Sequence, residues 1–135
     1  MTTSTDGRST IDVLYVEDQP MNMLLMEALF ERRPGLRLVG ATHGQHALEI
    51  GQQVQPELLL LDLRLPDCHG TTLLPVLRAR FGWADVPAIA VTAESDFDPQ
   101  GTGFLEVWTK PLDVGWVLER LDALLARHLG VAVGA

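Results

Sequence analysis

The most constraining feature of the chain is a run of four leucines, Leu58 to Leu61, that leads without polar alternation into Asp62. Unbroken apolar runs of this length are typical of strands covered on both faces, as in the middle of a parallel α/β sheet. In such sheets, ligands bind outside the carboxyl ends of the strands. A carboxylate at that position is therefore a candidate functional group.

A second apolar segment, residues 11–16, also runs directly into carboxylates, here Glu17 and Asp18. Pro20 follows two residues later, and apolar residues then recur at helical spacing from Met21 to Leu29. Proline is favoured in the first turn of a helix, which places the acidic pair in a strand-to-helix loop. Two expected strands thus end in acidic residues.

Strand and helix patterns alternate along the whole chain, which indicates a parallel sheet with helices on both faces. The expected strands are 11–16, 36–41, 57–61, 87–92 and 104–109. The expected helices are 20–33, 44–54, 70–81 and 112–129, the last with Asp113 as its N-cap. Residues 94–103 (ESDFDPQGTG) are rich in Asp, Pro and Gly, so we expect at most one or two helical turns there.

Length and charge indicate one globular domain, residues 10–129, between flexible tails at 1–9 and 130–135. The formal net charge of −8 argues against a non-specific nucleic-acid surface, which needs clustered Lys and Arg. No apolar stretch is long enough to span a membrane, and the polar first residues lack a signal-peptide core. We therefore expect a cytoplasmic protein that neither inserts into membranes nor binds nucleic acid.

Two further residues follow expected strands: Thr92 closes the fourth and Lys110 follows the fifth. In a parallel sheet both should meet the three carboxylates at one edge. Carboxylates so close together repel one another, which favours a bound cation. A set of oxygen ligands selects a hard ion such as Mg²⁺, while Lys110 and the Thr92 hydroxyl could hold a tetrahedral anion attached to a carboxylate.

Four motifs occur in order along the chain: YVEDQP, DLRLPDCHG, VTAE and TKP. Together they resemble the receiver domain of two-component response regulators, of the single-domain, chemotaxis-regulator-like kind, over about residues 10–129. The resemblance implies a flavodoxin-like (βα)5 fold, a doubly wound parallel sheet of strand order 2-1-3-4-5, here with a shortened or irregular fourth helix. It also implies that a histidine kinase or a histidine phosphotransfer protein phosphorylates Asp62.

The same resemblance assigns the metal ligands. Asp18 and Asp62 would bind Mg²⁺ directly, Glu17 would act mainly through a water, and the backbone carbonyl of Arg64 would complete the protein ligands. Phosphoryl transfer depends on alignment and charge neutralisation, and such a cluster suits both.

Thr92 and Lys110 would hold the phosphoryl oxygens. The chain would then be a phosphoacceptor signalling protein that catalyses only its own phosphorylation and dephosphorylation, rather than an enzyme. Because the expected last helix ends near residue 129, we expect no output domain. The signal would pass to a downstream protein target by phosphorylation-dependent binding, or onward by phosphorelay.

The sequence departs from the family in its switch region. Receivers commonly carry Tyr or Phe three residues before the lysine, where this chain has Val107. Trp108 is adjacent, but strand alternation points it to the opposite face. Thr92 and Lys110 are also closer in sequence than is usual in the family. We therefore expect signalling to rely on ordering or shifting of the 94–103 segment.

Arg64 and Glu94 lie two residues after Asp62 and Thr92, so their side chains could pair across the mouth of the site. Such a pair could shield a phosphate from water, or be no more than an exposed ion pair. His43 and His46, at the start of the second expected helix, are interpreted as surface histidines, with metal binding as the alternative.

Three other functions are open to a chain of this pattern. A degenerate receiver would act as a docking module without phosphorylation. An aspartyl-nucleophile phosphohydrolase would carry a second Asp where this chain has Arg64. Flavin binding would need a Ser/Thr/Gly loop after the first strand, where this chain has EDQPM. The complete set of Asp18, Asp62, Thr92 and Lys110 favours the phosphorylated receiver.

Overall fold

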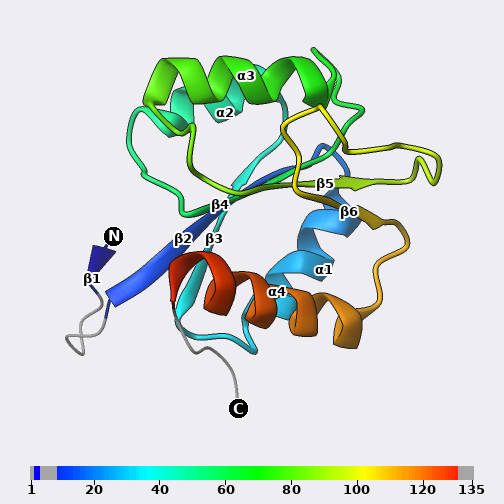
Figure 1. Cartoon of the computed structure of the whole chain (residues 1–135). Coiled ribbons are helices and arrows are strands. Elements are labelled where there is room, and N and C mark those ends of the chain that lie inside the picture. The colour runs from blue at the N-terminus through cyan, green and yellow to red at the C-terminus, as the bar shows by residue number, and fades with distance from the viewer. Residues whose placement is uncertain (1, 4–8, 131–135) are drawn as a thin grey trace.

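The computed structural model of the chain describes residues 2–3 and 9–130, in which a five-stranded parallel sheet carries a pair of helices on each face (Figure 1). The strands of this sheet are β2 (Ser9–Val16), β3 (Leu36–Ala41), β4 (Leu58–Leu61), β5 (Ala88–Thr92) and β6 (Glu106–Thr109). The helices are α1 (Pro20–Phe30), α2 (Gly44–Gly51), α3 (Gly70–Phe81) and α4 (Val114–Leu129). Helices α1 and α4 cover one face, and α2 and α3 cover the other (Figure 1).

The strands lie in the order β3-β2-β4-β5-β6, which confirms the predicted order 2-1-3-4-5. A sixth strand, β1 (Thr2–Thr3), pairs antiparallel with the first two residues of β2. This strand was not predicted, since residues 1–9 are expected to form a flexible tail. Residues 1, 4–8 and 131–135, on which most of both predicted tails fall, lie outside the described residues.

The four leucines of β4 are buried on both faces of the sheet, as their unbroken run predicts. Leu58 and Leu60 join the core under α1 and α4, and Leu59 and Leu61 join the core under α2 and α3. Side chains alternate along a strand, so one apolar run supplies both cores. The strand can then end in a polar residue at the sheet edge.

Helix ends differ from the predicted bounds by two or three residues. Helix α1 ends at Phe30 and α2 at Gly51, each three residues early, and both continue as turns whose amides donate to carbonyls three or four residues back. Helix α4 begins two residues late, at Val114, because Asp113 is its N-cap as predicted. The Asp113 Oδ1 accepts a hydrogen bond from the Trp116 amide at 2.8 Å.

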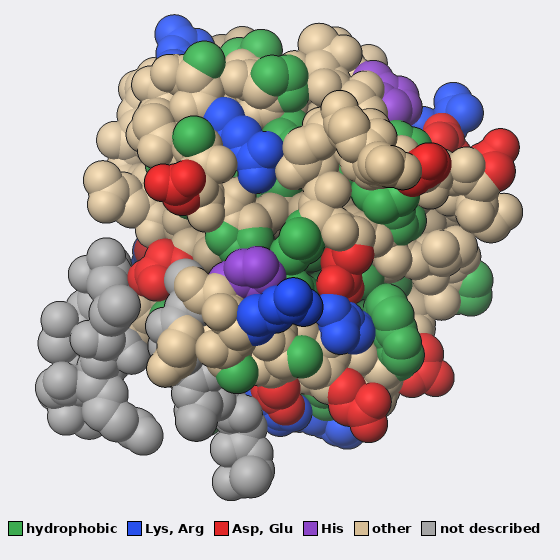
Figure 2. Space-filling view, in the orientation of Figure 1, with side chains coloured by type: hydrophobic (Ala, Val, Ile, Leu, Met, Phe, Trp, Pro, Cys, Tyr) green, Lys and Arg blue, Asp and Glu red, His purple; other side chains and the backbone are tan. Residues whose placement is uncertain are grey.

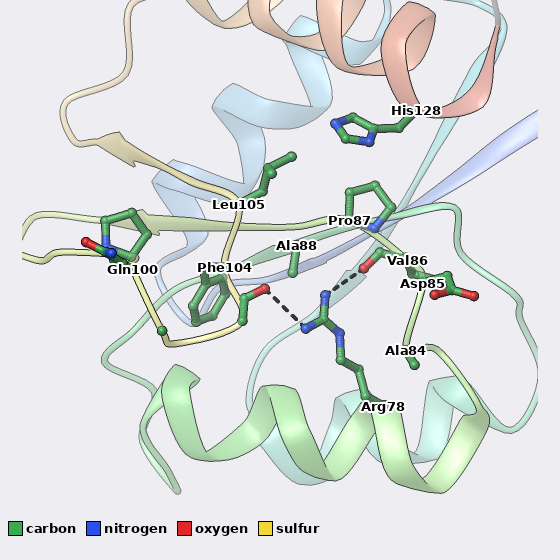
Figure 3. A pocket seen from close by; sticks show the side chains of 13 residues that line it. Arg78, Ala84, Asp85, Val86, Pro87, Ala88, Gln100, Phe104, Leu105 and His128 are labelled. Atoms are coloured by element: carbon green, nitrogen blue, oxygen red, sulfur yellow. Dashed lines mark hydrogen bonds between the residues drawn. The ribbon is translucent and has the colours of Figure 1, made fainter.

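Residues 93–105, all described, form turns and no helix between β5 and β6, so the shortened fourth helix is absent altogether. Arg78 of α3 braces the end of this segment, donating to the carbonyl oxygens of Gly103 (3.1 Å) and Val86 (2.8 Å) (Figure 3). Gly103 has φ +92°, and a Cβ there would lie 2.9 Å from Arg78 Nη1. Phe104 is buried in the core under α2 and α3, so the segment is anchored without a helix.

Two predictions from composition concern the surface. Within residues 2–3 and 9–130, the structure offers no helix with both the length and the apolar character needed to cross a bilayer. On the face seen in Figure 2, basic side chains lie in small groups among acidic ones. The cytoplasmic location and the absence of nucleic-acid binding stay predictions.

Candidate functional site

The carboxyl ends of β2, β4, β5 and β6 bring the predicted site residues to one edge of the sheet. The register aligns Val16 with Leu61, and Thr92 with Thr109, so the residues that follow these strands start level with one another. Glu17, Asp18 and Asp62 form a cluster in which one carboxylate oxygen from each residue lies within 4.8 Å of the others. The convergence predicted from the strand ends is therefore present.

Lys110 supplies the counter-charge to this cluster. Its Nζ lies 2.6 Å from Glu17 Oε1 and 3.1 Å from Asp62 Oδ2. Burial lowers the pKa of Lys110, but the hydrogen bond to Glu17 and the charge of Asp62 outweigh it and raise the pKa above its ordinary value. The ammonium group stays charged and bridges two acidic residues from different strands.

Asp62 is buried, with 6% of its surface exposed. Burial and the nearby charge of Glu17 raise the pKa of Asp62, and Lys110 only partly opposes them because its ammonium is shared with Glu17. The backbone amide of Arg64 donates to Asp62 Oδ1 at 3.2 Å. A second cation would relieve the remaining repulsion in the cluster.

The cluster fits a magnesium ion. Its donors are all oxygens, two of the three carboxylates are buried and Asp18 is partly exposed, so one side of the group opens to water. A hard, partly hydrated ion suits this combination better than a transition metal, which would select His or Cys. Among the described residues, these three form the one group of His, Cys, Asp or Glu close enough to hold a metal.

Sequence reasoning missed a further polar group at the site, the hydroxyl of Tyr15. It donates to Glu17 Oε1 at 3.0 Å, and the amide of Gln19 donates to Glu17 Oε2 at 3.1 Å. Burial, and then the charge of Glu17, raise the pKa of Tyr15 far above that of a free phenol, so the hydroxyl stays protonated. The signal was available, because residues two apart on a strand point to the same face.

Thr92 is buried at the end of β5, the strand beside β4. Its Oγ1 accepts a hydrogen bond from the amide of Glu94 at 3.1 Å. Because this contact uses the oxygen as an acceptor, the hydroxyl proton remains available for a ligand.

Arg64 and Glu94 make the pair predicted from their spacing, with Nε and Oε1 2.6 Å apart. The Arg64 side chain is 77% exposed and that of Glu94 is 22% exposed. Solvent screening makes such a pair a small contributor to stability. Its role in shielding a phosphate stays a prediction.

Val107 and Trp108 face opposite sides of the sheet, as strand alternation predicts. Trp108 is fully buried under α1 and α4, and its Nε1 donates to Glu106 Oε2 at 2.8 Å. Glu106 also pairs with Arg120 of α4, whose Nε lies 2.9 Å from Oε2. The place of the usual aromatic switch residue is thus taken by a partly buried valine.

The loop after Asp62 has structural roles. Asp67 accepts from the amides of Gly44 and Gln45 at the start of α2, at 2.8 and 2.9 Å. Cys68 packs against Gly44, and burial raises its pKa to about 11, so its reactive thiolate is scarce at neutral pH. His69 caps α3.

The two histidines at the start of α2 are also structural. His43 caps the helix, its Nδ1 accepting from the amide of His46 at 3.1 Å. Both are partly exposed, in keeping with their interpretation as surface residues.

The pocket drawn in Figure 3 is separate from the acidic cluster. It has a volume of about 330 Å³ and lies between the end of α3 and residues 99–105, with Ala88 in its lining. Ala88 begins β5, whereas Thr92 ends it, so the pocket and the acidic cluster lie at opposite ends of that strand.

Comparisons with known proteins agree with this geometry. Residues 13–119 match the family model of the response regulator receiver domain. The polar-differentiation response regulator DivK of Brucella anthropi is 30% identical over 117 residues, which make up 84% of this chain and 94% of DivK. The probable C4-dicarboxylate response regulator DctR of Halalkalibacterium halodurans is 32% identical over 123 residues, 87% of this chain and 51% of DctR. The chain thus spans about half the length of several curated relatives that it matches.

Solved structures show the same fold. The receiver domain of the sensor histidine kinase PA1611 from Pseudomonas aeruginosa superposes with a TM-score of 0.74 at 26% identity, covering 91% of this chain and all of that domain. That structure holds a magnesium ion in its active-site cleft. The chemotaxis response regulator CheY4 of Vibrio cholerae superposes with a TM-score of 0.77 at 20% identity, covering 87% of this chain and all of CheY4.

Proposed function

Since the chain belongs to the response regulator receiver domain family of two-component signalling, we propose that it accepts a phosphoryl group on Asp62. The observation that carries the proposal is the contact of Lys110 Nζ with Asp62 Oδ2 inside a cluster of three carboxylates. Isolated acidic loops are common on protein surfaces. A buried strand-end carboxylate in contact with a lysine from another strand is a specific arrangement.

The proposed reaction is transfer from a phosphohistidine. A carboxylate oxygen of Asp62 attacks phosphorus, the P–O bond forms, and the P–N bond breaks with its electron pair returning to the imidazole of the partner. Lys110 lies where its ammonium can meet a phosphoryl oxygen, and the Thr92 hydroxyl proton is available for another. The protein orients and neutralises charge, which is its main task in phosphoryl transfer.

Magnesium is the proposed cofactor. Asp18 and Asp62 would bind the ion, Glu17 would act mainly through a water, and the carbonyl of Arg64 would complete the protein ligands. When bound, the ion neutralises negative charge on the transferring group. The PA1611 receiver domain, with magnesium in its cleft, supports this proposal.

The proposed partners are a histidine kinase or histidine phosphotransfer protein as the donor, and a downstream protein that distinguishes the phosphorylated form. In this role the chain turns over only its own phosphate, and no external substrate. No contact among the described residues favours the docking-only or phosphohydrolase alternatives. The residue where a phosphohydrolase would carry its second acid is Arg64, which pairs with Glu94.

Acetyl phosphate provides the direct test, because it donates a phosphoryl group without a partner protein. We expect intact-mass spectrometry to find one added phosphate per chain in millimolar Mg²⁺ and none after chelation with EDTA. A titration that detects no magnesium binding at millimolar concentrations, or labelling that is independent of the metal, would contradict the proposal.

We predict that Arg64→Ala shortens the lifetime of the phosphate. Removing the guanidinium opens the mouth of the site, and we expect phosphate loss about threefold faster, in keeping with the small worth of exposed ion pairs. The measurement is the decay of the phosphorylated protein after the donor is removed. Arg80→Ala on the surface of α3 is the control. If Arg64→Ala loses phosphate at the wild-type rate, the pair of Arg64 and Glu94 is a surface contact only.

We also predict that activation orders the 94–103 segment. It has no helix, and Phe97 and Phe104 form an edge contact with ring centroids 6.2 Å apart that could tighten or shift. Amide hydrogen exchange is measured with and without beryllofluoride. We expect beryllofluoride to slow exchange in residues 94–103 more than in the 52–57 loop, which is the control. Equal exchange in both states would argue against this route of signalling.

A further inference from the structure

The hydroxyl of Tyr15 is a buried polar group that the proposed phosphoryl transfer leaves without a role. The Tyr15 side chain is fully buried in the core under α1 and α4, with only its hydroxyl directed at the acidic cluster. We propose that Tyr15 is a positioning residue that holds Glu17 for magnesium binding; this inference rests on the proposed function.

Glu17 is held by three donors. Its Oε1 accepts from both the Tyr15 hydroxyl and Lys110 Nζ, and its Oε2 accepts from the amide of Gln19. Glu17 is 1% exposed, so bulk solvent is a poor substitute for a donor that is lost. The Gln19 amide belongs to the loop that follows β2, and Lys110 would contact the phosphoryl group. Of the three donors, only the Tyr15 hydroxyl does neither.

Lys110 is a shared donor and so a poor anchor for Glu17. Its ammonium also contacts Asp62, and in the proposed reaction it turns towards a phosphoryl oxygen. Glu17 Oε1 would then keep only the Tyr15 hydroxyl. The rigid ring of Tyr15 is fully buried in the same core cluster as Met26, Leu60 and Trp108, and this burial fixes where that hydroxyl lies.

This arrangement accounts for an aromatic residue with a polar end in the last four residues of β2, which are otherwise apolar. The neighbours Leu14 and Val16 are fully buried and apolar. A phenylalanine at position 15 would fill the same space, so packing alone does not require the hydroxyl. Groups that orient a metal's ligands are often worth an order of magnitude in metal affinity.

The test is Tyr15→Phe, which removes one oxygen and keeps the ring. Magnesium alone is titrated, with binding followed by backbone amide NMR shifts, and initial rates of phosphorylation by acetyl phosphate are measured at each Mg²⁺ concentration. We expect about tenfold weaker magnesium binding in the variant. We also expect its phosphorylation rate to return to the wild-type value at saturating magnesium, because the residue acts through the metal site.

Asp12→Asn is the matched control, since it also removes a charge-assisted contact from a buried residue of β2. Asp12 pairs with Arg37 at 2.8 Å near the start of the strand, four residues before Val16. This variant should lose stability and bind magnesium normally. The inference would be overturned if Tyr15→Phe bound magnesium as tightly as the wild type or more tightly, or if Asp12→Asn weakened magnesium binding as much as Tyr15→Phe does. It would also be overturned if the phosphorylation rate of Tyr15→Phe stayed below that of the wild type at saturating magnesium. Failure of the wild-type protein to bind magnesium would instead refute the proposed function.

Discussion

Asp62→Asn should reduce phosphorylation by acetyl phosphate or by a phosphohistidine donor to background while leaving the fold intact. The amide has no anionic oxygen to attack phosphorus, but it has the shape of the carboxylate. Its Oδ1 can still accept from the Arg64 amide, and Lys110 keeps its contact with Glu17. Stability should change little, because burial and the nearby charge of Glu17 already disfavour the ionised form of Asp62.

Intact-mass spectrometry measures the incorporated phosphate, and urea unfolding measures stability. Asp122→Asn on α4, where Asp122 pairs with Arg33 away from the site, should be labelled like the wild type. If Asp62→Asn takes up phosphate at the wild-type rate, the acceptor is another residue.

The second large effect is expected from Lys110→Met. Without the ammonium, Glu17 and Asp62 lose their shared counter-charge, and both carboxylates are buried. We expect the free energy of unfolding at pH 7 without magnesium to fall by about 3 kcal/mol, as for a buried ion pair that loses one partner. Phosphorylation should also slow strongly, because the group that meets a phosphoryl oxygen is gone.

Magnesium distinguishes this loss from a general packing defect. A divalent ion replaces the missing charge and binds only the folded chain, so millimolar Mg²⁺ should stabilise Lys110→Met more than the wild type. Urea unfolding with and without magnesium measures the difference. Arg37→Met, which breaks the pair with Asp12, is the control and should show no extra rescue. Equal stabilisation of all three proteins would contradict the assignment of Lys110 to the metal-binding cluster.

Much of the site followed from the sequence because strands were recognisable by where their apolar runs stop. Glu17, Asp18, Asp62, Thr92 and Lys110 each stand at or just after a strand end, and parallel strands bring such ends to one edge. The pair of Arg64 and Glu94 followed in the same way, from two loops that begin side by side.

Contacts between residues far apart in the chain, which follow no regular sequence spacing, could not be predicted from the sequence. The brace from Arg78 to Gly103 joins α3 to a segment twenty-five residues later, and Arg33 reaches Asp122 across eighty-nine residues. Each depends on how an element packs, and no periodicity encodes that. The Pro and Gly residues of 94–103 weakened the expected helix, but its complete replacement by turns anchored through Phe104 was visible only in the structure.

The sequence by itself determined the strands, the order of acidic and basic residues at their ends, and so the class of chemistry, because alternation and apolar runs are local properties of the chain. Only the tertiary structure decided which donors hold each carboxylate. The bonds to Glu17 come from Tyr15 on the preceding strand, from the Gln19 amide in the same loop, and from Lys110, ninety-three residues away. Hydrogen-bond geometry at a buried charge is fixed by the packing of all the elements that surround it.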